Sequence, residues 1–427
     1  MLFTFLCLAF FGLALAGVPL VWSLLLATVS TIVAFDRFYP LQAVFLTHIG
    51  GMEPFHLIAI PLFIVAGELV SRGGVGRKII QFSTTLLSFL PGGLGIVTVA
   101  SCMFFGAVSG SAVACAAAIG SVMVPGMVRH GYSRPFAGAL VSTSGTLGII
   151  IPPSIPMMVY GFVGNVSVAD LFLSGFVPGL LFGLGLMAVC YWEGKRTGCD
   201  IGGRVPDLAA VWKMFRQCLP ALLMPLIILG GIYSGFFTPT EAAAVGVVYG
   251  LVIGLVVYRE ITLRDLPGII LDSFLISAVV VVVVGATTAL AWLVTLEQIP
   301  AQLIEIVNQV ASSRWAFLLL LNLSLLALGI FLEPLPALIL TAPLFIPTAK
   351  AFGVDPVHLG LIMTCNLAIG LYTPPVGGTL FVAAKIANAG IGAISRALIP
   401  QFVISLVVLM LITYIEALPM ALVWWAR

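Results

Sequence analysis

The amino-acid sequence predicts an all-α, polytopic membrane protein with inverted repeats, re-entrant helical hairpins and broken helices. Three observations lead to this fold class. Apolar residues make up 61% of the 427 residues and charged residues only 8%, so a soluble domain could not cover its core with polar surface. Apolar runs of spanning length recur, for example at 219–234, 267–296 and 397–426. Prolines and glycines interrupt such runs at corresponding places in the two halves.

The N-terminal stretch MLFTFLCLAFFGLALAG is expected to form a first span rather than a signal peptide. It lacks a basic n-region, and its apolar character continues through Phe35. The seven cysteines include no CxxC pair and the four histidines form no HExxH motif, so neither a disulfide framework nor a metalloenzyme is predicted. The net charge of +2 gives no reason to expect a nucleic-acid partner.

Basic residues mark the loops. The stretch 193–218 carries five of the 18 lysines and arginines, which is typical of a cytoplasmic loop, and we expect an interfacial amphipathic helix at 207–218. Three further basic loops lie at 72–78, 129–134 and 259–264.

The two halves of the chain resemble each other. A shift of 222 positions places the Pro-Pro pair at 152–153 on the pair at 374–375. At a slightly larger shift, ELVSRGGVGRKII (68–80) falls on WLVTLEQIPAQLI (292–304). Repeated halves with Gly- and Pro-interrupted spans indicate the binding site of a secondary transporter, and inverted repeats are the commoner arrangement for this pattern.

Each Pro-Pro break follows a segment that predicts a re-entrant hairpin. A proline inside a helix costs roughly 3 kcal/mol, and lipid cannot satisfy the freed carbonyls, so each break must face protein or a water-lined cavity. Residues 100–128 predict one hairpin with its tip at Ser109–Ser111, and 326–350 predict its counterpart with a tip near 332–336. The alternative for both segments is a helix-packing face rich in small residues.

The tips and breaks supply groups for ion and anion recognition. Broken helices expose carbonyls at one end and N–H groups at the other. Carbonyls and hydroxyls suit a hard cation such as Na⁺, and N–H ends attract a carboxylate.

Glu333, an acid at membrane depth, is a functional candidate, although it could also reach interfacial water. Two acids have local explanations: Glu241 completes a capping box with Thr238, and Glu68 can pair with Arg72.

The chain resembles the large membrane subunit of a TRAP transporter (tripartite ATP-independent periplasmic transporter, DctM type). The segments that carry the resemblance span nearly the whole chain: IPLFIVAGELVSRGG (60–74), SGSAVACAAAIGSVMVP (109–125), TSGTLGIIIPPSIPMM (143–158), GGIYSGFFTPTEAAA (230–244), FLEPLPALILTAPLFIP (331–347) and NLAIGLYTPPVGGTLFVA (366–383).

The resemblance implies a subunit of the bacterial inner membrane with a scaffold and an elevator-type transport domain. Its implied partners are a small four-helix membrane subunit, a periplasmic substrate-binding protein and the surrounding lipid. Its implied function is Na⁺-coupled import (symport) of a carboxylate such as a C4-dicarboxylate, sialic acid or another organic acid. The expected organisation is as follows: scaffold helices at 1–55, a first repeat at 56–165, central scaffold helices at 166–277, a second repeat at 278–390 and a C-terminal helix at 391–427.

The resemblance also implies which residues form the sites. One Na⁺ is expected near Ser109, Gly145 and Gly148. A second Na⁺ is expected near Gly329, Gly370, Thr373 and Val376. The substrate is expected between the tips, near Ser111, Ser154, Glu333 and Thr379.

Three other functions compete with this one. A stand-alone ion-coupled anion carrier would need no soluble partner. An intramembrane enzyme is disfavoured because the sequence offers no Ser-His-Asp arrangement or metal cluster at equivalent depth. A channel is disfavoured because paired broken spans suit alternating access better than a permanent pore.

Overall fold

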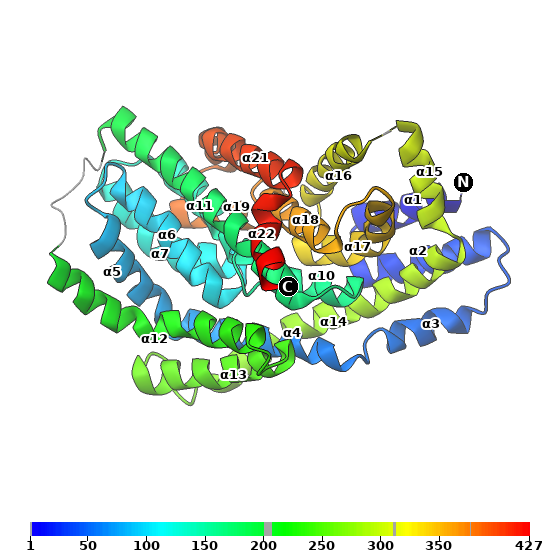
Figure 1. Cartoon of the computed structure of the whole chain (residues 1–427), viewed down its shortest axis with the longest axis horizontal. Coiled ribbons are helices and arrows are strands. Elements are labelled where there is room, and N and C mark those ends of the chain that lie inside the picture. The colour runs from blue at the N-terminus through cyan, green and yellow to red at the C-terminus, as the bar shows by residue number, and fades with distance from the viewer. Residues whose placement is uncertain (1, 200–206, 311–312, 376) are drawn as a thin grey trace.

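A computed structural model describes residues 2–199, 207–310, 313–375 and 377–427, and all regular secondary structure in these ranges is helical (Figure 1). The helices of the first half are α1 (Leu2–Leu15), α2 (Leu20–Ala34), α3 (Leu41–Gly50), the 3₁₀-helix η1 (Phe55–Ile58), α4 (Ala59–Arg72), α5 (Val75–Leu87), α6 (Gly93–Ser109), α7 (Ala112–Arg129), α8 (Arg134–Gly145), α9 (Leu147–Ile150), α10 (Ile155–Gly164) and α11 (Val168–Thr197).

The second half continues the helical pattern to the C-terminus. Its helices are α12 (Leu208–Tyr233), α13 (Pro239–Val252), the π-helix η2 (Ile253–Val257), α14 (Leu266–Leu296), α15 (Ile299–Val310), α16 (Arg314–Gly329), α17 (Pro334–Ala351), α18 (Pro356–Gly370), α19 (Gly378–Ala387), α20 (Ile391–Ala397), α21 (Ile399–Tyr414) and α22 (Ala417–Ala426).

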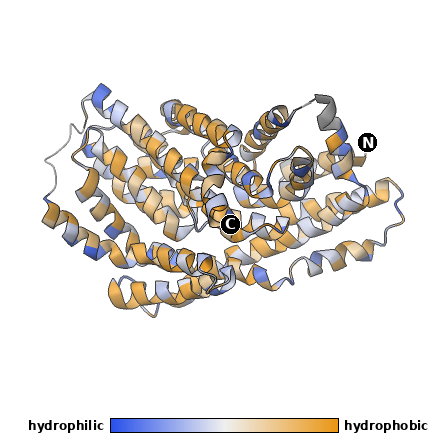
Figure 2. Ribbon diagram, viewed as in Figure 1, coloured by the Kyte–Doolittle hydropathy of each residue, from blue (hydrophilic) through white to orange (hydrophobic). Residues whose placement is uncertain are grey.

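The helices confirm a polytopic membrane protein. By length and composition, seven of the described helices can cross a membrane, or up to 10 if each bent pair counts as one span. Figure 2 shows apolar residues along nearly all of them.

The predicted repeat is present element by element. A shift of 224 positions carries the segment 41–72, which holds α3, η1 and α4, onto 265–296, which holds α14. The same shift carries the first residue of α5 onto that of α15, and α6 to α8 correspond to α16 to α18. The residue before α5, Gly74 (φ 78°), and the residue before α15, Gln298 (φ 51°), both have a left-handed conformation. The shift of 224 superimposes these two residues.

The repeats run in opposite directions. Arg72 forms an ion pair with Asp272 at 2.7 Å, whereas a Cβ on Gly51 would lie 2.5 Å from Oγ1 of Thr288. Residue numbers in the segment 41–72 therefore decrease in the direction in which residue numbers in α14 increase. Equivalent segments that lie antiparallel define an inverted repeat.

Two groups of helices form the molecule. The "long-helix layer" consists of α3, α4, α12, α13 and α14, which run along the lower edge of Figure 1. The "hairpin core" consists of α6 to α10 and α16 to α19. Within it the repeats interlock: α10 packs on α17 and α18, while α19 packs on α7 and α8. Each broken helix is therefore held by the opposite repeat.

The predicted hairpins and breaks are present, with longer first arms than expected. α6 begins at Gly93 and α16 at Arg314, so the arms extend beyond 100–128 and 326–350. The halves of the first broken helix are bent by 42°. Both Pro-Pro peptide bonds are cis.

Three sequence expectations are corrected. The first apolar stretch is a pair of packed helices, α1 and α2, because Gly17 (φ 85°) and Pro19 end the first and begin the second. The expected surface helix at 207–218 is the start of α12, which continues to Tyr233 with two internal prolines. The expected C-terminal helix at 391–427 is three helices, α20, α21 and α22, and the last two are bent by 50° relative to each other.

The four basic loops gather at one end of the long-helix layer. The contacts that join them are Arg77–Glu260, Tyr258–Gln217 and Gly131–Cys199. Because basic loops favour the cytoplasmic side, this end of the layer is the expected cytoplasmic end.

Candidate functional site

The first hairpin turns at Gly110. Gly110 has φ 63°, a conformation that glycine adopts without the strain of a Cβ. Ser111 then caps α7, since its Oγ accepts a hydrogen bond from the N–H of Ala114 at 3.4 Å. The N–H of Ser111 donates to Oγ of Ser109 at 3.5 Å. The SGS sequence thus reverses the chain and leaves two hydroxyls at the tip.

The second hairpin turns between Gly329 and Pro334. Pro334 begins α17, a position where its missing N–H costs nothing. Glu333 immediately precedes it, and its side chain is exposed at the tip. The second tip therefore presents a carboxylate where the first presents hydroxyls.

Hydroxyl groups bridge both helix breaks in the same way. The hydroxyl of Ser154 donates to the carbonyl of Ile149 at 2.5 Å. The hydroxyl of Thr379 donates to the carbonyl of Leu371 at 2.9 Å. Ile149 and Leu371 are related by the shift of 222, so each repeat satisfies the carbonyl just before its break with a hydroxyl just after it.

The first arm of each hairpin crosses the broken helix at a pair of glycines. A Cβ on Gly106 would lie 2.7 Å from Cα of Gly148, and a Cβ on Gly370 would lie 2.5 Å from the carbonyl oxygen of Gly329. Only glycine permits such close backbone approach. The crossing brings backbone carbonyls next to each break.

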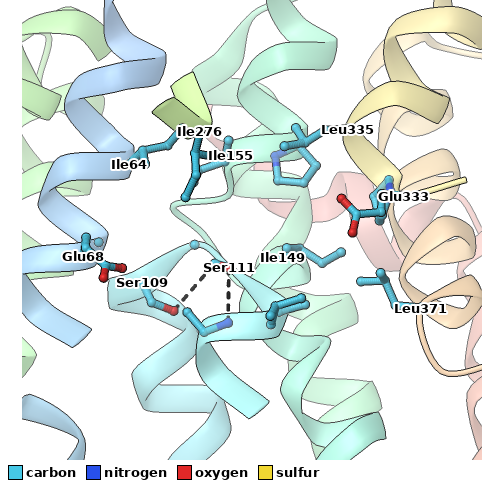
Figure 3. A pocket seen from close by; sticks show the side chains of 17 residues that line it. Ile64, Glu68, Ser109, Ser111, Ile149, Ile155, Ile276, Glu333, Leu335 and Leu371 are labelled. Atoms are coloured by element: carbon cyan, nitrogen blue, oxygen red, sulfur yellow. Dashed lines mark hydrogen bonds between the residues drawn. The ribbon is translucent and has the colours of Figure 1, made fainter. Parts of the chain in front are cut away.

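The two tips and two breaks line a cavity of about 160 Å³, together with residues of α4 and α14. Figure 3 shows Glu68 and Glu333 on opposite sides of it, with Ser109 and Ser111 between them. The residues that line it are Ile64, Gly67, Glu68, Ser109 to Ala114, Ile149, Ile155, Pro156, Ile276, Glu333, Pro334, Leu335 and Leu371.

Helix N-termini surround this cavity. The first residues of α7, α10 and α17 all line it. The start of α19 is close as well, since a Cβ on Gly378 would lie 3.7 Å from Oε1 of Glu333. The lining contains no lysine or arginine among the described residues. Positive potential at the cavity therefore comes from helix N-termini, which attract anions.

The predicted substrate residues divide into two sets. Ser111 and Glu333 line the cavity. Ser154 and Thr379 are 1% and 0% exposed and lie outside the lining, where their hydroxyls bind the carbonyls of two lining residues.

The residues predicted for Na⁺ lie around the breaks. Ser109 lines the cavity, and Cβ atoms on Gly145 and Gly148 would lie 3.1 Å and 2.8 Å from the carbonyl oxygens of Ala112 and Ser111. In the second repeat, Gly329 and Gly370 cross as described above. The hydroxyl of Thr373 donates to the carbonyl of Ile369 at 2.7 Å. Val376 lies outside the described residues.

Oxygen atoms are the available cation ligands at both breaks. Among the described residues no cluster of histidine, cysteine, aspartate or glutamate can hold a metal ion. Backbone carbonyls and hydroxyls remain, and these are ligands that suit a hard monovalent cation.

Sequence reasoning missed Glu68 as a residue of the cavity. Its predicted pairing with Arg72 is confirmed at 2.6 Å, but the same carboxylate faces the cavity. The available signal was an acidic residue directly after the apolar run 59–67 of the same helix. The predicted capping box of Thr238 and Glu241 is also confirmed.

Sequence reasoning also missed a buried amide network behind the second break. Nδ2 of Asn366 donates to Oδ1 of Asn322 at 2.8 Å, and Nδ2 of Asn322 donates to Oγ1 of Thr413 at 3.2 Å. The network ties α16, α18 and α21 together, and it supports the helix that leads into the break.

Two interlocked inverted repeats, with hairpin tips and broken helices around a small cavity, define a secondary membrane transporter. The family model of the "Tripartite ATP-independent periplasmic transporter, DctM component" matches residues 7–418. The chain belongs to this family: it is a TRAP transporter large permease and a multi-pass protein of the inner membrane. The family is one of transporter permeases and not of enzymes.

Named relatives agree with the family. The chain is 43% identical over 373 residues to the C4-dicarboxylate TRAP transporter large permease protein DctM of Pseudomonas aeruginosa, covering 87% of each. It is 41% identical over 410 residues to the isethionate TRAP transporter permease protein DctMQ of Oleidesulfovibrio alaskensis, covering 95% of this chain but 64% of that protein. It is 36% identical to the sialic acid TRAP transporter large permease protein SiaM of Vibrio cholerae, covering 94% and 93%.

A solved structure shows the same fold. The crystal structure of the Alcanivorax borkumensis YdaH transporter superimposes with a TM-score of 0.64 at 13% identity, covering 87% of this chain and 88% of that one.

Proposed function

We propose that the chain is the carrier subunit of a Na⁺-coupled importer of a carboxylate solute, working by an elevator-type mechanism. The observation that carries the proposal is the single cavity at which both hairpin tips and both helix breaks meet. Relatives named for C4-dicarboxylate, isethionate and sialic acid support an organic anion as substrate.

The substrate carboxylate is expected at the helix N-termini. The N–H groups at the start of α7 and the hydroxyls of Ser109 and Ser111 can donate hydrogen bonds to it. Glu333 is an acceptor at the other tip, so it suits a hydroxyl or amine of the substrate. The proposed pose therefore places the anionic end at the first tip and a donor group at the second.

Na⁺ is expected to travel with the substrate, bound at the two breaks. The first site would use oxygens near Ser109, Gly145 and Gly148, and the second those near Gly329, Gly370 and Thr373. Because the breaks form the walls of the cavity, a cation at either break fixes the positions of Ile149 or Leu371. Na⁺ would thus order the site for the anion and also offset its charge.

The proposed assembly has two further components. A small four-helix membrane subunit would complete the permease, and a periplasmic substrate-binding protein would deliver the solute. The name of the DctMQ relative, of which this chain covers 64%, supports a second membrane component.

Uptake by proteoliposomes tests the function. The chain is reconstituted with the small subunit, and radiolabelled malate, isethionate and sialic acid are presented with their binding proteins in Na⁺ or K⁺ buffer. Uptake of one solute that requires both Na⁺ and its binding protein is expected. Equal uptake in K⁺ buffer would remove the Na⁺ coupling, and uptake of free solute would favour a stand-alone anion carrier.

A further inference from the structure

A network of buried polar side chains lies behind the second helix break. Asn366 on α18 and Asn322 on α16 are both 0% exposed, and Thr413 on α21 is 1% exposed. Nδ2 of Asn366 donates to two oxygens of Asn322, the backbone carbonyl at 3.0 Å and Oδ1 at 2.8 Å. Nδ2 of Asn322 donates in turn to Oγ1 of Thr413 at 3.2 Å and to the carbonyl of Leu318 at 2.9 Å. We call Asn366, Asn322 and Thr413 the amide network.

The amide network joins the same two helices that cross at Gly329 and Gly370. Asn366 precedes Gly370 by four residues on α18, and Asn322 precedes Gly329 by seven on α16. At a rise of 1.5 Å per residue, the two contact points are about 6 Å apart along α18 and about 10 Å apart along α16. A single contact point would let one helix pivot on the other. Two points fix the angle between the helices, and the hydrogen bonds also fix their register because they are directional.

The angle between α16 and α18 decides where the oxygens of the proposed second Na⁺ site lie. Gly329 is the last residue of α16, Gly370 is the last residue of α18, and Thr373 follows within the break. The carbonyls at the two helix ends therefore move relative to each other whenever the helices do. The size and rigidity of a ligand cage determine which cation it prefers. Groups that hold the ligands in place can change metal affinity about tenfold or more without touching the ion.

The first repeat carries different residues at the corresponding positions. The shift of 222 relates Asn366 to Ser144, whose hydroxyl donates to the carbonyl of Leu140 at 2.6 Å within α8. The residue seven positions before Gly106 is Val99, which has no hydrogen-bonding side chain. Both repeats thus share the glycine crossing, and the second repeat adds two asparagines to it. An addition to one of two equivalent crossings indicates a role at that break rather than in the fold that both repeats share.

We propose that Asn366, Asn322 and Thr413 are positioning residues for the second Na⁺ site. By fixing the angle between α16 and α18, they set the affinity of that site for Na⁺ and its preference for Na⁺ over the smaller Li⁺. Thr413 extends this control to α21, so the packing of that helix bears on the ion site as well. The inference rests on the Na⁺ coupling proposed above.

A role in stability alone predicts a different result, and a double substitution separates the two roles. Loss of one amide leaves a buried polar atom of its partner unsatisfied, which destabilises the fold in either case. Leucine has the branched shape of asparagine, and replacing both partners of a buried hydrogen bond by apolar groups of the same shape can be nearly neutral. Asn322→Leu/Asn366→Leu should therefore fold, but its contact between α16 and α18 lacks directional hydrogen bonds.

Thermal unfolding of the purified permease, assembled with its small subunit, gives the readout. The unfolding midpoint is measured in choline chloride, and again as NaCl or LiCl replaces the choline salt, with no substrate present. For Asn322→Leu/Asn366→Leu we expect a midpoint in choline close to that of the wild type. The Na⁺ concentration that gives half of the rise in midpoint should increase about tenfold, and the preference for Na⁺ over Li⁺ should narrow. Thr413→Val, which keeps the asparagine pair, should shift the Na⁺ concentration in the same direction by less.

Gln401→Leu is the matched control, because it removes a 0% exposed amide of α21 that lies outside the network. Its Na⁺ and Li⁺ concentrations should equal those of the wild type. Unchanged values in the double variant would limit the network to a structural role and overturn the proposal. If the double variant does not fold, Thr413→Val decides, and wild-type ion concentrations in it overturn the proposal. A wild-type permease whose midpoint does not rise with Na⁺ would instead refute the proposed Na⁺ coupling, and the inference with it.

Discussion

Gly329 and Gly370 lie backbone against backbone, so close that a Cβ on Gly370 would be 2.5 Å from the carbonyl oxygen of Gly329. Gly106 and Gly148 repeat this crossing in the first half. The two crossings hold each hairpin against its broken helix, and they fix the distance between tip and break.

Gly370→Ala should therefore destabilise the protein. The added methyl group meets backbone, which cannot move aside as a side chain can, and overpacking of this kind costs about 1–3 kcal/mol. Thermal unfolding in detergent should show a lower midpoint, and Na⁺-dependent uptake should fall. Gly392→Ala, where nothing lies within 4 Å of the new Cβ, is the control. Equal unfolding midpoints for the two variants would show that the backbones of Gly329 and Gly370 leave room for a methyl group.

Ser154→Ala should weaken Na⁺-dependent uptake while the protein still folds. The change removes the hydroxyl that binds the carbonyl of Ile149, and an unsatisfied buried acceptor costs about 1–3 kcal/mol. Thr379→Val, its counterpart at the second break, should behave alike. Ser395→Ala removes a similar bond to the carbonyl of Ile391 far from the cavity and should have no effect on uptake. Wild-type Na⁺ dependence in both break variants would exclude these hydroxyls from the mechanism.

Thr373→Ala should raise the Na⁺ concentration needed for half-maximal uptake. Its hydroxyl lies at the second break and is half-exposed, so it is available to a cation in addition to the carbonyl of Ile369. Loss of one neutral oxygen ligand should cost about 1 kcal/mol of binding. Thr348→Ala removes a comparable bond to the carbonyl of Leu344 within α17 and serves as the control. An unchanged Na⁺ requirement in Thr373→Ala would place the cation elsewhere.

Glu333→Gln should separate charge from hydrogen bonding at the second tip. The amide keeps an acceptor oxygen but loses the negative charge, and hydrogen bonds to charged groups contribute about 1.5–3 kcal/mol. Uptake should fall about tenfold to a hundredfold at low substrate concentration. Glu305→Gln on the exposed surface of α15 is the matched control. Full activity in Glu333→Gln would reject a need for the charge.

The junctions before α5 and α15 should differ in their tolerance of substitution. Gly74→Ala places a Cβ 2.6 Å from Cγ of Glu260 at φ 78°, and the left-handed conformation alone costs about 1–2 kcal/mol. Gln298→Gly removes such strain at the repeat-related junction. Unfolding midpoints should fall in the first variant and hold or rise in the second. Gly268→Ala, with nothing within 4 Å, controls for the added methyl group, and a midpoint as low as that of Gly74→Ala would refute the junction argument.

Several features followed from the sequence alone because they depend on local chemistry. Composition required a membrane protein, the serine-glycine-serine turn and the Pro-Pro pairs located the tips and breaks, and the internal repeat related the halves. The capping box at Thr238 and the pairing of Glu68 with Arg72 are likewise contacts between residues close in sequence.

Only the tertiary structure decided which of these features meet. It placed Ser154 and Thr379 behind the cavity wall. There each hydroxyl donates a hydrogen bond to a backbone carbonyl five or eight residues earlier in the chain. It brought Glu68 to the cavity from a helix that the sequence links to neither hairpin. The sequence repeat identifies equivalent segments of the two halves, but it does not say which segments touch, because those contacts depend on packing between residues far apart in the sequence.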